Sequence, residues 1–392
     1  MIDVDELLRR GWRAHPFRQF LLKVHSRCNL ACDYCYVYTL ADQSWRSQPM
    51  IMDPALITVA AHRIAQHADD HDLTSVRVIL HGGEPLLAGH GYLANIVDTI
   101  RKEVGGGLRV DAAIQTNAVL LDAAALRSFS ALDVRVGVSL DGSPRGNNRN
   151  RRFADGRGSY DAVARALRLL GSEPFRHLYS GLLCTVDLAN SPIETYEALI
   201  EFEPPAIDFL VPHATWDSPP PTRDPDATPY ADWLITIFDH WYGSRGETVI
   251  RLFEEIINVL LGRSSATEVI GLTPSSLVVI ETDGTIEQTD SLKVVQQGAA
   301  ATGLNIVDHS FDAALRHPGI VARQLGWDAL SDTCQACRFG RVCGGGLYAH
   351  RYRTGSGFRN PSVYCDDLYR LIEHIRARLV ADLRRSTGRP IT

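Results

Sequence analysis

Three cysteines near the start of the chain are close enough to share a metal centre. Cys28, Cys32 and Cys35 lie in CNLACDYC with the spacing C-x3-C-x2-C, in a chain with 8 cysteines among 392 residues. Three thiolates are one short of a closed site and leave one metal position open to a reacting ligand. Zinc with His25 as fourth ligand is one interpretation, but His25 lies in an apolar run. A four-iron cluster with one open iron is the favoured alternative.

A second set of cysteines lies in the C-terminal tail. Cys334, Cys337, Cys343 and Cys365 have the spacing C-x2-C-x5-C-gap-C. Four thiolates close an iron–sulfur cluster, which suits electron transfer or structural support rather than ligand binding. A structural zinc is the alternative. Cys184 stands alone in an apolar run and is predicted to be a core residue.

The elements that must position these cysteines follow an alternating pattern. Apolar β-rich runs are predicted strands at 20–25, 75–83, 108–117, 134–140, 180–188 and 207–213. Helical periodicity falls between them, at 54–68, 92–104, 123–132 and 159–170. This alternation predicts parallel βαβ units, in an incomplete β/α barrel or a doubly wound sheet. In both folds the active groups collect at the C-terminal ends of the strands.

Polar motifs occur at four of these strand ends. Cys28 follows the first strand, HGGEP (81–85) ends the second, QTN (115–117) ends the third and SLDG (139–142) ends the fourth. Glycine and asparagine at any one strand end can be simple turn residues. Four motifs on the same edge favour a binding site there.

The rest of the chain divides into further segments. We expect an N-terminal segment at 1–17, the barrel at 18–215, a bridging region at 216–274 and a C-terminal domain at 275–392. The bridge opens with a Pro-rich passage (216–229), followed by predicted helices at 230–243 and 249–262. The C-terminal domain opens with a hairpin at 275–290 that turns at Asp-Gly, and it closes with a helix from Cys365.

Composition excludes several classes of partner. Hydrophobic residues make up 45%, charged residues 22%, and the net charge is −6, so no attraction to nucleic acid or to an anionic membrane is expected. We find no signal peptide and no apolar stretch of about 18 residues. These features predict a cytoplasmic protein, in which clustered thiols are metal ligands rather than disulfides.

The motifs together resemble the radical S-adenosylmethionine (SAM) enzymes over about residues 18–215. The resemblance implies a partial (β/α)6 TIM-like barrel in which Cys28, Cys32 and Cys35 hold a [4Fe–4S] cluster. SAM completes the cluster and is cleaved to a 5′-deoxyadenosyl radical that abstracts hydrogen from substrate. By the same resemblance the SAM-binding residues are Tyr34, Gly82, Gly83, Glu84, Pro85, Gln115, Asn117, Ser139, Asp141 and Arg151, with Arg151 pairing the SAM carboxylate.

The tail is similar to the SPASM extension of radical SAM peptide maturases. The full pattern holds two auxiliary clusters, but two ligand positions of the first are Thr289 and Leu347 here, and 263–283 contains no cysteine. The resemblance thus implies two [4Fe–4S] clusters in all, one SAM-binding and one auxiliary. It also implies that Asp290, next to Thr289, is a general base. The alternative is that Asp290 is a solvent-exposed carboxylate of the hairpin without a catalytic role.

Within this group the hairpin and tail resemble the FxsB-type maturases most. These form a C–C crosslink (cyclophane) between an aromatic ring carbon and the Cβ of a nearby residue in a ribosomally made peptide. The implied partners are a precursor peptide and a reductase such as flavodoxin or ferredoxin. Epimerisation, thioether formation and oxidation of Ser or Cys to formylglycine are alternatives. A non-catalytic iron–sulfur electron carrier is the alternative from another class.

Overall fold

A sheet of parallel strands forms the centre of the molecule. The computed structural model describes residues 2–220, 227–244 and 246–387. Its first six strands are β1 (Gln19–His25), β2 (Ser75–Gly82), β3 (Arg109–Thr116), β4 (Val134–Ser139), β5 (Tyr179–Thr185) and β6 (Ala206–Leu210). Each pairs in parallel with the next along the chain. The six predicted strands are confirmed, with ends shifted by a few residues.

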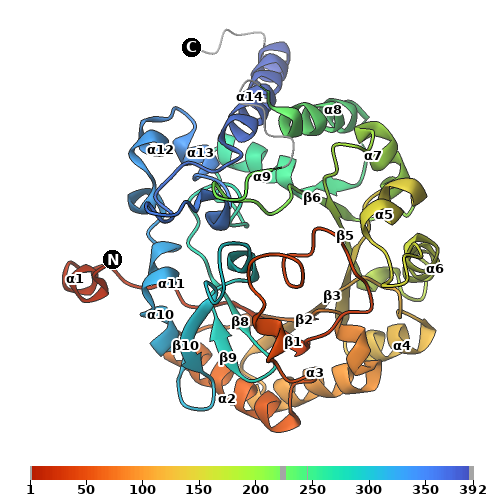
Figure 1. The fold of residues 1–392 in the computed structure, drawn as a ribbon, viewed down its shortest axis with the longest axis vertical. Coiled ribbons are helices and arrows are strands. Elements are labelled where there is room, and N and C mark those ends of the chain that lie inside the picture. Colours follow the sequence, from red (N-terminus) through yellow and green to blue (C-terminus); the bar gives the residue numbers. More distant parts are fainter. Residues whose placement is uncertain (1, 221–226, 245, 388–392) are drawn as a thin grey trace.

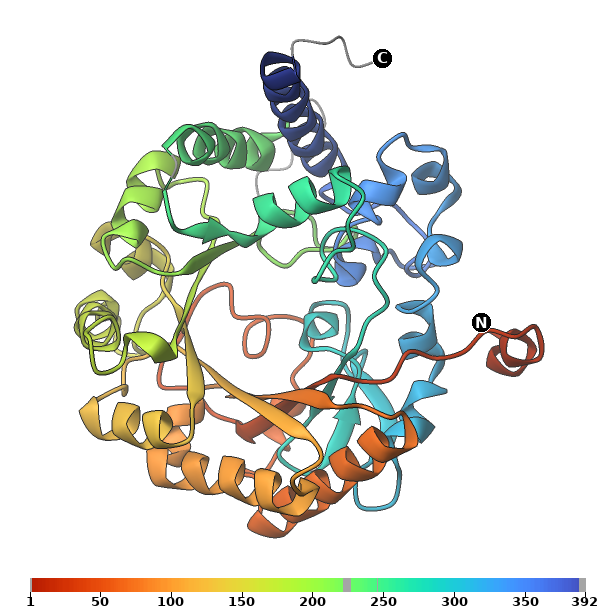
Figure 2. The same cartoon turned by 180° about the vertical axis from the view of Figure 1, so that it is seen from behind.

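Helices surround this sheet as an outer ring (Figures 1 and 2). They are α2 (Pro54–Asp70), α3 (His90–Val104), α4 (Ala123–Ala131), α5 (Pro144–Asn150), α6 (Tyr160–Leu170) and α7 (Pro192–Ile200). Local sequence sets where they begin: Asp53 caps α2 and Ser191 caps α7, each followed by proline at the first helical position. The strand order is linear, so the result is a partial α/β barrel.

The sheet extends beyond the six strands at both edges. Beside β6 lies β7 (Val249–Ile250), and beside β1 lie β8 (Leu277–Ile280), β9 (Thr285–Glu287) and β10 (Ala301–Asn305). The helix expected over 249–262 therefore begins only at Arg251, as α9 (Arg251–Leu260), because its first two residues pair with β6. The predicted hairpin forms, and β8 also pairs in parallel with β1.

The C-terminal region packs against one side of the ring. Its helices are α10 (Phe311–Leu315), α11 (Pro318–Ala322), α12 (Asp332–Ala336), α13 (Gly340–Cys343) and α14 (Cys365–Thr387), and α14 packs on α8 (Pro229–Ser244). In both cartoon views α1 (Val4–Arg9) stands away from the body. Residues 221–226 of the expected Pro-rich passage lie outside the described residues. Among the described helices, none combines the length and apolarity needed to cross a bilayer.

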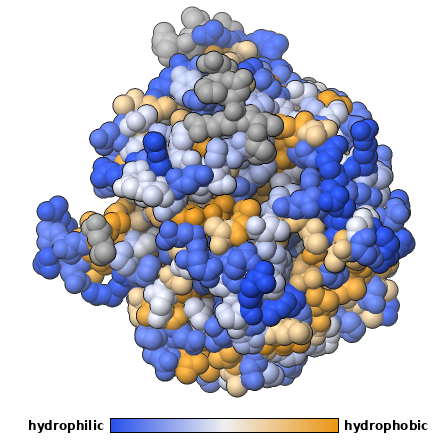
Figure 3. All heavy atoms as spheres, in the orientation of Figure 1, coloured by the Kyte–Doolittle hydropathy of each residue, from blue (hydrophilic) through white to orange (hydrophobic). Residues whose placement is uncertain are grey.

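The loop after β1 crosses the middle of the ring (red in Figure 1). It begins at Ser26, returns to β1 by a bridge between His25 and Ile51, and carries the first three cysteines. The surface of the same view is largely polar, with apolar side chains gathered across its middle (Figure 3). The fold thus brings the cysteine loop over the C-terminal ends of the parallel strands.

Candidate active site

A cavity of about 270 Å³ lies between the cysteine loop and the strand ends. Most of the predicted cluster and SAM residues line it: Cys28, Cys32, Cys35, Tyr34, Gly82, Gly83, Gln115, Asn117, Ser139 and Arg151. Glu84, Pro85, Asp141 and Asp290 are not among the lining residues. The structure therefore brings residues from four strand ends together, as expected, and holds a few of them behind the cavity wall.

The glycines of HGGEP are required by the close approach of two loops. A Cβ on Gly83 would lie 1.8 Å from the Tyr38 hydroxyl oxygen and 2.5 Å from the Arg27 carbonyl oxygen. Gly82 has φ +156°, and its Cβ would lie 2.2 Å from the His25 carbonyl oxygen. Only glycine allows the strand end to meet the cysteine loop at this distance.

Glu84 acts inside the protein rather than in the cavity. Its fully buried carboxylate accepts hydrogen bonds from Leu86 N (2.9 Å), Thr116 Oγ1 (2.6 Å) and Asn117 N (2.7 Å). Burial raises the pKa of Glu84 against the effect of these donors. The carboxylate thus ties the end of β2 to the end of β3 and leaves the backbone of the motif facing the cavity.

Arg151 is the cavity's available cation. Its Nη1 donates to the Tyr34 hydroxyl (2.9 Å), which donates in turn to Asp141. Asp141 also accepts from Thr185 N at 3.0 Å. The Arg151 Nε is buried and has no hydrogen-bond partner among the described residues. A buried donor without a partner is costly, so the site fits an incoming anionic group such as a carboxylate.

The two arginines beside Arg151 already have partners. Arg149 pairs with Asp187 at 2.8 Å and Arg152 pairs with Asp33 at 2.7 Å. This difference could not be predicted from the sequence NRNRRF, because nothing in it tells the three side chains apart.

Asp290 is buried behind the cavity wall. It is 7% exposed, which excludes the solvated hairpin carboxylate considered above, and its Oδ2 lies 2.6 Å from the Lys23 Nζ. Burial alone would raise the pKa of Asp290, but Lys23 and Lys293 outweigh it and lower the pKa. The carboxylate is therefore ionised. The His81 Nδ1 lies 4.0 Å from the same oxygen, and His81 does line the cavity.

Sequence reasoning missed the surroundings of Asp290. Lys23 is paired with His81 across β1 and β2, and it is 2% exposed. Burial lowers the pKa of His81 to about 4, as it does for His213, whose ring packs on Tyr36 at 4.8 Å. A signal for Lys23 was present, since a lysine in an otherwise apolar strand needs a buried partner.

The tail cysteines surround a second, smaller cavity of about 100 Å³. Its lining residues are Thr333, Cys334, Cys337, Phe339, Gly340, Cys343, Gly345, Ser362, Cys365 and Tyr369. All four predicted ligands therefore meet, although 31 positions separate the first from the last. Burial raises the pKa of Cys343 to about 11 and of Cys365 to about 12.

The spacing of the sulfurs tests zinc against a cluster. In the described residues, no three cysteines have all their sulfurs within 4.8 Å of one another. A tetrahedral zinc with Zn–S bonds of about 2.3 Å holds its sulfurs only about 3.8 Å apart. Both cysteine sets are thus more open than a zinc site and fit the wider iron–sulfur cluster.

The fold and the open three-thiolate site are those expected of a radical SAM enzyme. Residues 22–202 match the sequence model of the radical SAM superfamily. The cofactors of such an enzyme are SAM and [4Fe–4S] clusters, and the alternative of a non-catalytic electron carrier is set aside.

The chain has SPASM-type homology to anaerobic sulfatase-maturating enzymes. It is 24% identical over 378 residues to the cysteine-type enzyme of Clostridium perfringens, covering 93% of this chain and 98% of that enzyme. It is 21% identical over 381 residues to the serine-type enzyme of Bacteroides thetaiotaomicron, covering 92% and 90%.

Two groups of solved structures share the fold. Native anSMEcpe with bound AdoMet and Kp18Cys peptide has a TM-score of 0.79 at 22% identity, covering 94% of this chain and 99% of that one. Streptococcus suis SuiB bound to precursor peptide SuiA has a TM-score of 0.59 at 15% identity, covering 92% and 78%.

Proposed function

We propose that the protein is a maturase that forms a C–C crosslink in a ribosomally made peptide, between an aromatic ring carbon and the Cβ of a nearby residue. The observation that carries the proposal is that three sites occur together in one molecule. These are an open three-thiolate site on a cavity, a buried carboxylate behind a cavity histidine, and a separate four-thiolate site. Solved relatives were obtained with peptides, which supports a peptide substrate.

In this proposal the cavity residues hold SAM. Cys28, Cys32 and Cys35 hold the open cluster, and Arg151 receives the SAM carboxylate through its free Nε. Gln115 and Ser139 hydrogen-bond each other at 3.1 Å on the cavity wall, where they can also bind ribose hydroxyls. When bound, the cofactors supply hydrogen-atom removal from a substrate carbon and uptake of one electron.

The chain's own residues then manage the proton. A crosslink removes two hydrogens from the peptide: one leaves as an atom, and the other leaves the ring as a proton and an electron. Because His81 lines the cavity and Asp290 does not, the proton meets His81 first. Asp290, ionised beside Lys23 and 4.0 Å from His81, serves as the acceptor through that ring. Lys23 keeps the acceptor ready in its charged form.

The four tail cysteines would hold the auxiliary cluster, which would supply the electron acceptor when bound. Their cavity is lined by few polar side chains, so it has little to offer a ligand besides the thiolates. For the electron supply, Cys28, Cys32 and Cys35 also line an outer hollow of about 420 Å³ beside Trp45. A reductase such as flavodoxin or ferredoxin can approach the open cluster from that side.

Oxidation of Ser or Cys to formylglycine is the second candidate, because relatives over nearly the whole chain are sulfatase-maturating enzymes. Against it, Thr289 and Leu347 stand at ligand positions of an auxiliary cluster that the full SPASM pattern contains. Arg323, which pairs with Glu268 at 2.6 Å, donates to the Gln288 carbonyl next to Thr289.

The test is an anaerobic assay with the short peptide encoded beside this gene. Crosslinking removes two hydrogens, but so does oxidation of serine, so mass alone does not separate the candidates. A hydrazide reagent labels formylglycine and leaves a cyclophane unlabelled. Tandem mass spectrometry of an unlabelled product should show no cleavage between the joined residues. A hydrazide-reactive product would overturn the crosslink proposal.

A further inference from the structure

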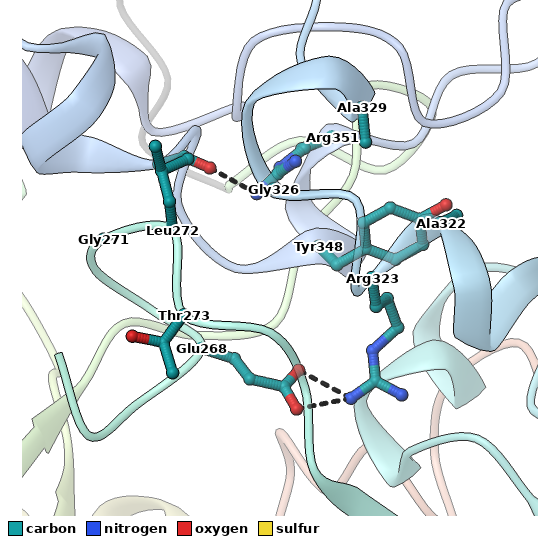
Figure 4. A pocket seen from close by; sticks show the side chains of 11 residues that line it. Glu268, Gly271, Leu272, Thr273, Ala322, Arg323, Gly326, Ala329, Tyr348 and Arg351 are labelled. Atoms are coloured by element: carbon teal, nitrogen blue, oxygen red, sulfur yellow. Dashed lines mark hydrogen bonds and ion pairs between the residues drawn. The ribbon is translucent and has the colours of Figure 1, made fainter. Parts of the chain in front are cut away.

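Two arginines lie in the same small pocket, of about 40 Å³, between the hairpin and the four-cysteine site (Figure 4). Arg323 is neutralised: its Nη2 lies 2.6 Å from both oxygens of Glu268 and also donates to Ser275 Oγ at 2.7 Å. Arg351 is 8% exposed, and among the described residues no carboxylate lies within ion-pair distance of it. The pocket therefore holds one positive charge more than its single carboxylate balances.

Backbone carbonyls hold Arg351 in place. Its Nη2 donates to Gly344 O (2.6 Å) and Gly346 O (2.8 Å), and its Nε donates to Gly345 O (3.1 Å). All three glycines have positive φ, between 63° and 80°. A Cβ on Gly345 would lie 3.0 Å from the Arg351 Cζ. The three glycines of CGGG thus form a turn that points three carbonyl oxygens toward one guanidinium.

The same turn connects Arg351 to the four-cysteine site. The glycines follow Cys343 directly, and Gly345 lines the cysteine cavity. Burial lowers the pKa of Arg351, while Cys343 and Cys334 are the strongest influences that raise it. A buried cation without a carboxylate is costly unless another negative group compensates it. Here that group would be the set of thiolates that a bound cluster keeps in their charged form.

We propose that Arg351 raises the reduction potential of the auxiliary cluster and so makes that cluster an electron acceptor. The inference rests on the proposed assignment of a [4Fe–4S] cluster to the four cysteines. Reduction adds one negative charge to a cluster that thiolates already make negative, and net charge and hydrogen bonds set such potentials. A fixed buried cation stabilises the reduced state more than the oxidised state. Arg351 is thus a positioning residue that acts through the cluster.

The experiment is a potentiometric titration of the full chain, followed by electron paramagnetic resonance. Cys28, Cys32 and Cys35 are replaced by Ala in every sample, so that only the four-cysteine site can hold iron. Arg351→Gln should lower the ratio of reduced to oxidised cluster about tenfold at the parent's midpoint, a shift of about 59 mV for one electron. Arg341→Gln is the matched control. Arg341 lies two residues before Cys343, but its charge is exposed and stacks on Trp327, so solvent screens it.

A second variant guards against loss of the cluster in Arg351→Gln. Glu268→Gln leaves Arg351 untouched but removes the one negative charge of the pocket, so the potential should rise. An unchanged potential in Arg351→Gln with full iron would overturn the inference. So would an unchanged potential in Glu268→Gln if Arg351→Gln loads no iron. A parent that holds no iron at this site would overturn the cluster assignment itself, and the inference with it.

Discussion

The two cysteine sites differ in what surrounds the thiolates. The three-cysteine loop faces a cavity of about 270 Å³ that contains a free Arg151 donor and polar side chains from several strand ends. The four tail cysteines line a cavity of about 100 Å³ together with two aromatic side chains, Phe339 and Tyr369. One site is incomplete and offers groups to a ligand, while the other is complete by itself. The difference favours ligand chemistry at the first site and electron transfer at the second.

Removing the open site should have the largest effect. Replacing Cys28, Cys32 and Cys35 by Ala should halve the iron, from roughly eight atoms per chain, and abolish 5′-deoxyadenosine formation. Iron assay and chromatography measure the two outcomes. Cys184→Ala is the matched control, because Cys184 is buried in β5 and lines neither cavity, so this variant should keep both the iron and 5′-deoxyadenosine formation. Iron near twelve atoms per chain would mean that a third cluster has found other ligands.

Loss of the proposed proton acceptor should have the next largest effect. Asp290→Asn keeps the shape of the side chain but removes its charge, so crosslinked product should fall by about 10²–10⁴-fold. SAM cleavage precedes this step, so 5′-deoxyadenosine should still form. His81→Asn should give the same uncoupled result if the proton passes through its ring.

Glu287 is the positional control for Asp290, since its carboxylate pairs with Lys293 at 2.9 Å rather than with Lys23. Full crosslinking by Asp290→Asn would contradict its role as proton acceptor. Loss of both outputs would instead point to substrate placement or folding.

Replacing Arg151 should have a smaller effect, confined to the affinity for SAM. Arg151→Ala removes a charge-assisted hydrogen bond worth roughly 1.5–3 kcal/mol, or about ten- to hundredfold in affinity. Arg149→Ala should leave affinity nearly unchanged, because Arg149 is engaged with Asp187. Calorimetry or equilibrium dialysis measures both. The reverse pattern would show that the SAM carboxylate is bound by Arg149.

Half-buried neutral histidines predict a pH effect on stability. Burial lowers the pKa of His213 to about 4, below its value of about 6.5 in the unfolded chain. The unfolded chain therefore binds more protons between these values, and stability falls as pH drops from 6.5 toward 4. Each pH unit costs about 1.4 kcal/mol for this group. Urea titrations followed by tryptophan fluorescence should show a shallower loss in His213→Asn. An equal slope would contradict a lowered pKa of His213 in the folded chain.

The sequence predicted the parts of the molecule that depend on short-range pattern. Alternating apolar runs predicted the six strands, and cysteine spacing predicted both cysteine groupings. Strand pairings between distant segments could not be predicted, because an apolar strand such as LVVI (277–280) fits beside any buried strand. The pairing of β8 with β1 brings Asp290 to Lys23 and His81, which lie on strands far away in the chain. Glu84 was expected at the cavity because the other residues of its motif were expected there. Its carboxylate instead accepts a hydrogen bond from Thr116 inside the protein.

The contrast between an open and a closed site is tested most directly by adding SAM to two variants and recording their electron paramagnetic resonance spectra. One variant lacks Cys334, Cys337 and Cys343, and the other lacks Cys28, Cys32 and Cys35. We predict that SAM changes the spectrum of the reduced cluster in the first variant, where the open site remains. It should leave the spectrum of the second variant unchanged. A SAM-dependent change in the second variant, or none in the first, would contradict the assignment of ligand chemistry to the three-cysteine site.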